Sequence, residues 1–111
     1  LLLRFAILAP IIPGMLNETQ KKFLRGRAHS LKPVVWIGGS GLSEAVDAEI
    51  EQALASHELL KTRIRVGDRD SRNEIIQRIC RERKAELVQR IGNTAVFYRA
   101  NPDLTGIILP A

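Results

Sequence analysis

The sequence of 111 residues contains only one cysteine, one tryptophan, one tyrosine and one methionine. The single cysteine, Cys80, cannot form an internal disulfide, and no group of Cys and His residues has the spacing of zinc ligands. A disulfide scaffold and a zinc finger are therefore excluded, and a reducing compartment such as the cytoplasm is expected. No apolar stretch is long enough to cross a bilayer, so we expect no membrane partner.

The chain also lacks the short motifs of common catalytic and cofactor sites. It has no GxSxG, no HExxH and no Walker A lysine after a glycine loop. The two histidines, His29 and His57, lie in separate expected helices without a nearby cluster of carboxylates or cysteine. We therefore expect no enzyme activity, no catalytic residue, no metal or other cofactor, and no small-molecule substrate.

The charged residues are unevenly distributed. The chain has 17 Lys and Arg, 12 of them Arg, against 12 Asp and Glu, which gives a net charge of +5. Arginine binds phosphate through a planar, two-pronged guanidinium, so nucleic acid is the leading class of partner. Residues 42–58 contain five acids and no Lys or Arg. The positive surface is therefore expected on the segments before and after this region.

The two ends of the chain differ from its centre. Residues 1–14 are mostly apolar, are too short to span a bilayer and lack the cleavage site of a signal peptide. Met15 stands where the sequence turns polar, which favours Met15 as the natural start and residues 1–14 as a leader; a targeting arm is the alternative. We expect one domain over residues 15–99 and a C-terminal tail over residues 100–111.

Helical and strand patterns alternate after Met15. Asn17 and Gln20 form a capping box before helically spaced apolar residues, and Ser71 and Glu74 have the same spacing. Helices are expected at about 17–29, 42–57 and 71–84, and strands at 34–37, 59–66, 85–91 and 95–99. This αβαβαββ order predicts a single α/β (α+β) domain with a four-stranded mixed sheet. Helices would pack mainly on one face and leave the other face available for a ligand.

A glycine-rich loop, Gly38-Gly39-Ser40-Gly41, joins an expected strand to the amino end of an expected helix. Glycines allow a phosphodiester to approach the backbone closely, and the free amides and dipole at a helix N-terminus favour an anion. The same GxxG spacing clamps the RNA backbone in KH modules. We expect these four residues to contact RNA phosphate through backbone amides; a tight turn without a ligand is the alternative.

Basic side chains gather on the first helix and the second strand. The period of two in the second strand places its basic residues on the side away from its apolar residues. The basic residues of the first helix and of the segment after it precede the glycine loop. Together with the loop, the expected RNA-binding residues are Lys22, Arg25, His29, Lys32, Lys61, Arg63 and Arg65. Solvated charges that maintain solubility are the alternative.

Three other features favour structural roles. Trp36 lies in the apolar run 34–37, which is typical of a buried strand, so burial is expected rather than stacking on a base. Cys80 has the helical spacing of a small core residue. A solvated helix face is expected for Glu44, Asp47, Glu49 and Glu51, with a metal or a basic ribosomal protein as the alternative ligand.

Several segments together resemble the CRM domain, the chloroplast RNA splicing and ribosome maturation domain. They are QKKFLRGRAHSLKPVV at 20–35, IGGSGL at 37–42, EIEQAL at 49–54 and HELLK at 57–61. The later segments LVQRIGN at 87–93 and FYR at 97–99 fit the same pattern. The resemblance covers about residues 16–99, with its motifs in the expected order.

The resemblance implies an αβαβαββ fold related to the C-terminal domain of bacterial translation initiation factor three. It also implies RNA binding without catalysis, and association of the stand-alone bacterial YhbY-like members with precursors of the large ribosomal subunit. In the family a basic or amide side chain commonly lies inside the loop, whereas Gly39 and Ser40 carry no charge. The expected function is thus a cytoplasmic RNA-binding factor that assists ribosome maturation on the pre-ribosomal particle. The alternative is an adaptor that docks its acidic helix on basic ribosomal proteins.

Overall fold

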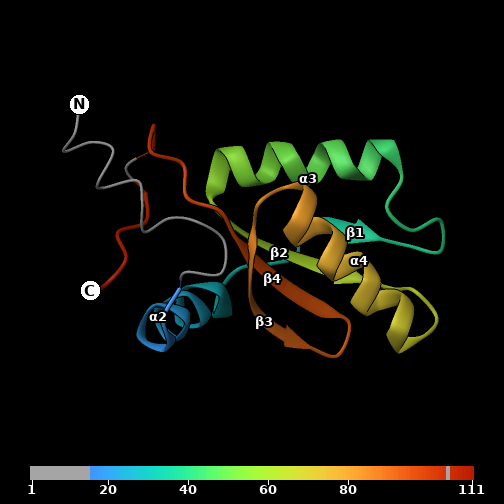
Figure 1. The fold of residues 1–111 in the computed structure, drawn as a ribbon, viewed down its shortest axis with the longest axis horizontal. Coiled ribbons are helices and arrows are strands. Elements are labelled where there is room, and N and C mark those ends of the chain that lie inside the picture. The colour runs from blue at the N-terminus through green and yellow to red at the C-terminus, as the bar shows by residue number, and fades with distance from the viewer. Residues whose placement is uncertain (1–15, 105) are drawn as a thin grey trace.

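The computed structural model describes residues 16–104 and 106–111, which fold in the predicted αβαβαββ order (Figure 1). The elements are α2 (Glu18–His29), β1 (Val35–Ile37), α3 (Glu44–His57), β2 (Leu59–Ile64), α4 (Arg69–Glu82), β3 (Glu86–Ile91) and β4 (Thr94–Tyr98). The expected leader, residues 1–14, lies outside the described residues. Within the described part, no helix is both long and apolar enough to cross a membrane.

The four strands form one mixed sheet in the order β1-β2-β4-β3. β1 runs parallel to β2 because α3 carries the chain back between them, and the other two pairs are antiparallel. Gly92 and Asn93 join β3 to β4, and Gly92 has the positive φ of 55° that this tight turn requires. The predicted α+β domain with a four-stranded mixed sheet is confirmed.

Apolar side chains on both faces of the sheet form two cores. The larger core lies under α3 and α4, and the smaller core lies under α2, on the opposite face (Figure 1). Ile50, Leu54, Ile76 and Ile79 from the helices meet Leu60, Ile64 and Phe97 from the sheet in the larger core. Leu24 and Ala28 of α2 meet Leu59, Val88, Val96 and Tyr98 in the smaller one. Two helices therefore share one face, and α2 covers part of the other.

The expectation that Trp36 is buried is wrong. Val35 and Ile37 enter the larger core, and the alternation of a strand turns Trp36 to the opposite face, where it is 53% exposed. On that face α2 packs against β2 and β3, and no helix of the described residues packs extensively on the edge strand β1 there. The apolar run that resembled a fully buried strand is a strand buried on one side only.

Local hydrogen bonds fix where the helices begin. The capping box of Asn17 and Gln20 is present, and the Ser43 side chain caps α3. The second expected capping box, at Ser71 and Glu74, is wrong because α4 begins earlier. Asp68 is its N-cap and accepts a hydrogen bond of 2.7 Å from the amide of Ser71. This bond lowers the pKa of the Asp68 carboxyl, which supplies the negative charge that a helix N-terminus favours.

The segment after β4 runs back beside α2 (Figure 1). The amide of Asn101 donates to the buried carboxylate of Glu58 at 2.7 Å, and the side chain of Gln20 donates to the carbonyl of Pro110 at 3.0 Å. Ile107 and Leu109 pack against the smaller core. This C-terminal segment is therefore attached to the domain on both sides of residue 105.

Candidate nucleic-acid interface

A basic groove of about 260 Å³ lies on the sheet face that α2 covers only in part. Arg25 and His29 from α2 and Lys61 and Arg63 from β2 line it, together with Gln89, Ile91, Thr94 and Val96 from the neighbouring strands and Pro33. No acidic residue is among the residues that line it. The structure thus brings together four of the side chains that the sequence predicts to bind RNA, from two elements that lie far apart along the chain.

Lys61 has a structural role as well as a place in the basic groove. Its Nζ donates to the carbonyl oxygens of Ala28 and Leu31, each at 3.1 Å. These carbonyls belong to the C-terminal end of α2 and the turn after it, where a cation is stabilising. An ammonium group has three donors, so one remains for a phosphate. The sequence shows that Lys61 is basic, but no pattern in it indicated the two hydrogen bonds to the end of α2.

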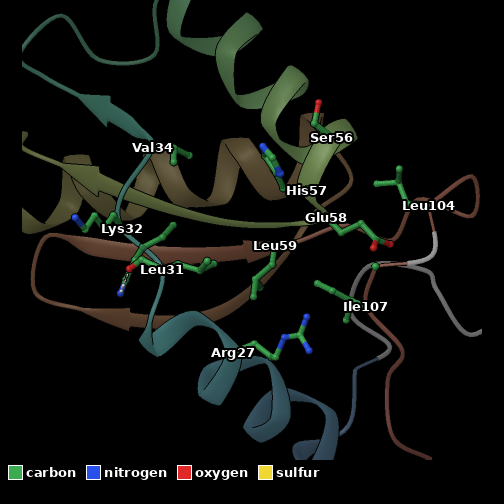
Figure 2. A pocket seen from close by; sticks show the side chains of 12 residues that line it. Arg27, Leu31, Lys32, Val34, Ser56, His57, Glu58, Leu59, Leu104 and Ile107 are labelled. Atoms are coloured by element: carbon green, nitrogen blue, oxygen red, sulfur yellow. Dashed lines mark hydrogen bonds between the residues drawn. The ribbon is translucent and has the colours of Figure 1, made fainter.

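A second pocket has a volume of about 520 Å³ (Figure 2). Lys61 lines both this pocket and the basic groove. The second pocket lies between the C-terminal ends of α2 and α3 and the C-terminal segment. Lys32 and Arg27 line this pocket, as does His57 at the end of α3. Lys32 therefore lines a different pocket from Arg25 and His29, and Lys22, exposed on α2, lines neither pocket.

Arg63 and Arg65 extend the positive surface from the basic groove toward the glycine loop. Their guanidinium carbons lie 5.4 and 5.0 Å from the centre of the Trp36 ring. The amide of Arg65 donates to the carbonyl of Ile37 at 2.7 Å, directly before the loop begins. Neither arginine pairs with a carboxylate among the described residues. Sequence reasoning missed Trp36 here, because residues 34–37 are all apolar and their pattern does not show which side chains face away from the core.

The glycine loop is a tight turn that leaves backbone donors exposed. Gly41 donates to the carbonyl of Gly38 at 2.9 Å and has a φ of 69°, which favours glycine. Within the described residues, the amides of Gly39 and Ser40 donate to no acceptor, and both residues are exposed. The loop leads into α3 through Ser43, whose side chain already accepts the amide of Val46. Two uncommitted amides therefore lie just before the positive end of a helix.

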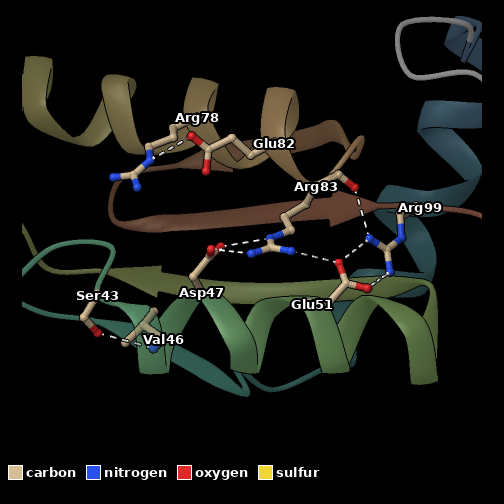
Figure 3. Close-up of polar contacts among 8 residues, drawn as sticks. All are labelled: Ser43, Val46, Asp47, Glu51, Arg78, Glu82, Arg83 and Arg99. Atoms are coloured by element: carbon tan, nitrogen blue, oxygen red, sulfur yellow. Dashed lines mark hydrogen bonds and ion pairs between the residues drawn. The ribbon is translucent and has the colours of Figure 1, made fainter.

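The acidic face of α3 is partly neutralised within the fold (Figure 3). Asp47 pairs with Arg83, and Glu51 pairs with Arg99 at 2.7 Å and with Arg83 at 3.4 Å. Hydrogen bonds from these arginines lower the pKa of both carboxyls. The expectation of a fully solvated acidic face is wrong for these two residues, because the end of α4 and the residue after β4 face them. Glu44 and Glu49 remain exposed.

The cysteine and the carboxylates of the described residues form no metal site. Cys80 packs against the larger core as expected, and burial raises the pKa of its thiol. Among residues 16–104 and 106–111, no cluster of three His, Cys, Asp or Glu residues could hold a metal ion. The basic groove, the arginines beside Trp36 and the glycine loop therefore make up the candidate interface.

The fold and this surface define a small α+β domain with a basic, half-open sheet face and a glycine turn at the amino end of a helix. Residues 16–99 match the profile of the CRS1 / YhbY (CRM) domain, and the chain belongs to this family. The resemblance seen in the sequence is confirmed.

Known relatives agree with this assignment. The chain is 50% identical over 88 residues to an RNA-binding protein of Haemophilus influenzae, covering 79% of this chain and 89% of the relative. It is 41% identical over 87 residues to a probable RNA-binding protein of Pseudomonas aeruginosa, covering 78% and 84%. The solution structure of a hypothetical protein from Staphylococcus aureus has the same fold, with a TM-score of 0.75 and 33% identity. That match covers 86% of this chain and all of the other.

Proposed function

We propose that this protein binds RNA through the basic groove and the glycine loop, without catalysing a reaction. The observation that carries this proposal is the gathering of Arg25, His29, Lys61 and Arg63 in one groove that no acidic residue lines. Such a surface neutralises phosphates and displaces their counterions. Membership of the CRM family and the names of the relatives support RNA as the polyanion.

The chemistry of binding follows from the types of donor present. Arg25 and Arg63 offer planar guanidiniums that can bind a phosphate with two parallel hydrogen bonds. The amides of Gly39 and Ser40 offer neutral donors at the amino end of α3. These amides would bind a phosphate beside Arg63 and Arg65. Phosphate contacts of this kind position an RNA strand without reading its sequence.

We further propose that the RNA belongs to precursors of the large ribosomal subunit, and that the protein assists ribosome maturation in the cytoplasm. This part rests on the family resemblance. The alternative, an adaptor that docks an acidic helix on basic ribosomal proteins, has less support because Asp47 and Glu51 are already paired with arginines.

Two measurements test these proposals separately. Affinity for a structured ribosomal RNA fragment should fall at least tenfold in the Arg25→Ala, Arg63→Ala double variant, as judged by fluorescence anisotropy of labelled RNA. Unchanged affinity in a folded variant would remove the basic groove from the interface. Crosslinking in cells, followed by sequencing of the attached RNA, should recover large-subunit precursor RNA. Recovery of other RNAs alone would overturn the ribosomal part and leave RNA binding in place.

A further inference from the structure

The only tryptophan of the chain lies on the surface in a place where folding alone does not require it. Trp36 is 53% exposed on β1, while the two residues beside it in the strand are fully buried. Val34, two residues earlier and just before the strand, is 58% exposed. A large aromatic side chain left in water forgoes a considerable gain from burial. We therefore attribute the exposure of Trp36 beside the glycine loop to a role in binding a ligand.

Two arginines, Arg63 and Arg65, pack against the Trp36 ring. Arg63 is its direct partner across the parallel strand pair, and Arg65 follows two residues later, just past the end of β2. Their guanidinium carbons lie within 5.4 Å of the ring centre, close enough for cation–π attraction. The Nε of Arg63 is buried and has no acceptor among the described residues. The aromatic ring thus lies beside two positive charges, and no carboxylate of residues 16–104 or 106–111 forms an ion pair with either.

We propose that Trp36, Arg63 and Arg65 form a stacking site for one unpaired nucleobase, so that the protein prefers single-stranded RNA segments to duplex. The inference rests on the proposed function and deepens it by naming the form of RNA recognised. Unstacked bases bind to aromatic rings and to guanidinium planes, whereas the bases of an A-form duplex are stacked on one another and inaccessible.

The position of the ring suits a nucleotide better than an apolar protein partner. Trp36 is separated from the glycine loop by Ile37 alone, so a base stacked on it places the adjoining phosphates near Arg65 and the free amides of Gly39 and Ser40. An apolar partner would instead bury two uncompensated guanidiniums, which is costly. Base stacking on the ring and phosphate binding beside it are satisfied together by one strand of RNA.

The fluorescence of Trp36 reports directly on this site, because the chain has no other tryptophan. We would titrate the protein with a single-stranded ribo-oligonucleotide, with an abasic strand of the same length and charge, and with a duplex of the same length. The single strand is expected to quench the emission strongly and to bind about tenfold more tightly than the abasic strand. Equal affinity and equal emission with all three RNAs would overturn the stacking site while leaving RNA binding intact.

Substitutions separate stacking from general apolar contact. Trp36→Leu is expected to weaken single-strand binding about tenfold with no change in the salt dependence, because every group that binds phosphate is still present. Trp36→Phe should retain most of the affinity. Val34→Ala, which shortens an exposed apolar side chain two residues away, should bind like the parent protein. If Trp36→Leu binds the single strand as tightly as the parent, the proposal is wrong. If the parent protein binds none of the RNAs, the proposed function fails as well.

Discussion

The Nζ of Lys61 lies 3.1 Å from the carbonyl oxygen of Ala28, so a lysine of the sheet donates a hydrogen bond to the C-terminal end of α2. α2 carries Arg25 and His29, and this bond ties it to the strand that carries Arg63. Two elements that line the basic groove are thereby fixed relative to each other through one side chain. A residue predicted from its charge to bind RNA therefore also holds other predicted RNA-binding residues in place.

The Lys61→Met variant should lower the free energy of unfolding by about 1 kcal/mol, because two carbonyl oxygens lose a charged donor while the aliphatic stem is kept. Urea unfolding followed by circular dichroism measures this change. Lys22→Met removes the same charge from an exposed position of α2 and serves as the control. Equal stabilities of the two variants would show that the bonds from Lys61 do not support α2.

The loop variant Gly39→Asp, Ser40→Asp should reduce RNA affinity about tenfold or more, because two carboxylates would repel the phosphate at the free amides. A side chain at Gly39 fits, since an added Cβ would have no atom within 4 Å. The uncharged variant Gly39→Ala, Ser40→Ala controls for the change in loop conformation and should bind nearly as the parent does. Binding of the aspartate variant with parental affinity would place the phosphates elsewhere.

The double variant Arg63→Ala, Arg65→Ala should lower the slope of log affinity against log salt by about one unit for each phosphate that is no longer bound. The affinity should fall similarly for RNAs of different sequence. Arg69→Ala, Arg81→Ala removes equal charge from exposed positions of α4, on the other face of the sheet, and should leave slope and affinity nearly unchanged. If both double variants behave alike, binding depends on net charge and not on this surface.

Acid should weaken the ion pairs between α3 and the two arginines that face it. The pKa values of Asp47 and Glu51 lie below the ordinary 3.8 and 4.5 because of hydrogen bonds from Arg83 and Arg99. Their contribution to stability is therefore complete above these ordinary values and is lost as the pH falls through the lowered ones.

Urea unfolding between pH 7 and pH 2 measures this dependence. The Asp47→Asn, Glu51→Gln variant should show a shallower loss of stability in acid, and at pH 7 each substitution should cost less than about 1 kcal/mol because the pairs are partly exposed. Glu82→Gln breaks the exposed pair with Arg78 and should change little. An unchanged acid profile in the double variant would assign the pH dependence to other carboxyls.

The order of the elements could be predicted from the sequence because helical and strand periodicities alternate clearly and glycines separate them. The capping box at Asn17 was correct for the same local reason. Ser71 was misassigned because an acidic side chain three residues earlier, Asp68, competes for the same role and takes it. Trp36 was misassigned because a strand of three residues is too short to display its alternation, and whether a helix covers it depends on the tertiary arrangement.

The candidate site was predicted in its residue types but not in its geometry. Arg25 and His29 meet Lys61 and Arg63 only because α2 packs across β2 and β3, and no local pattern specifies that arrangement. Lys32 lies in the second pocket, and the pairing of Asp47 with Arg83 joins residues 36 positions apart. Long-range contacts of this kind depend on how the elements pack together.

The two outer strands of the sheet also limit self-association. β1 has only three residues, with Pro33, which has no amide hydrogen, shortly before it and the glycine loop directly after it. β3, at the opposite edge, is interrupted by an irregularity between Leu87 and Gln89. A second chain would find a short row of backbone groups at one edge and a distorted row at the other, so edge-to-edge growth into a continuous intermolecular sheet is disfavoured. The short and irregular edges thus lower the risk of strand pairing between copies that an exposed tryptophan on an edge strand would otherwise bring.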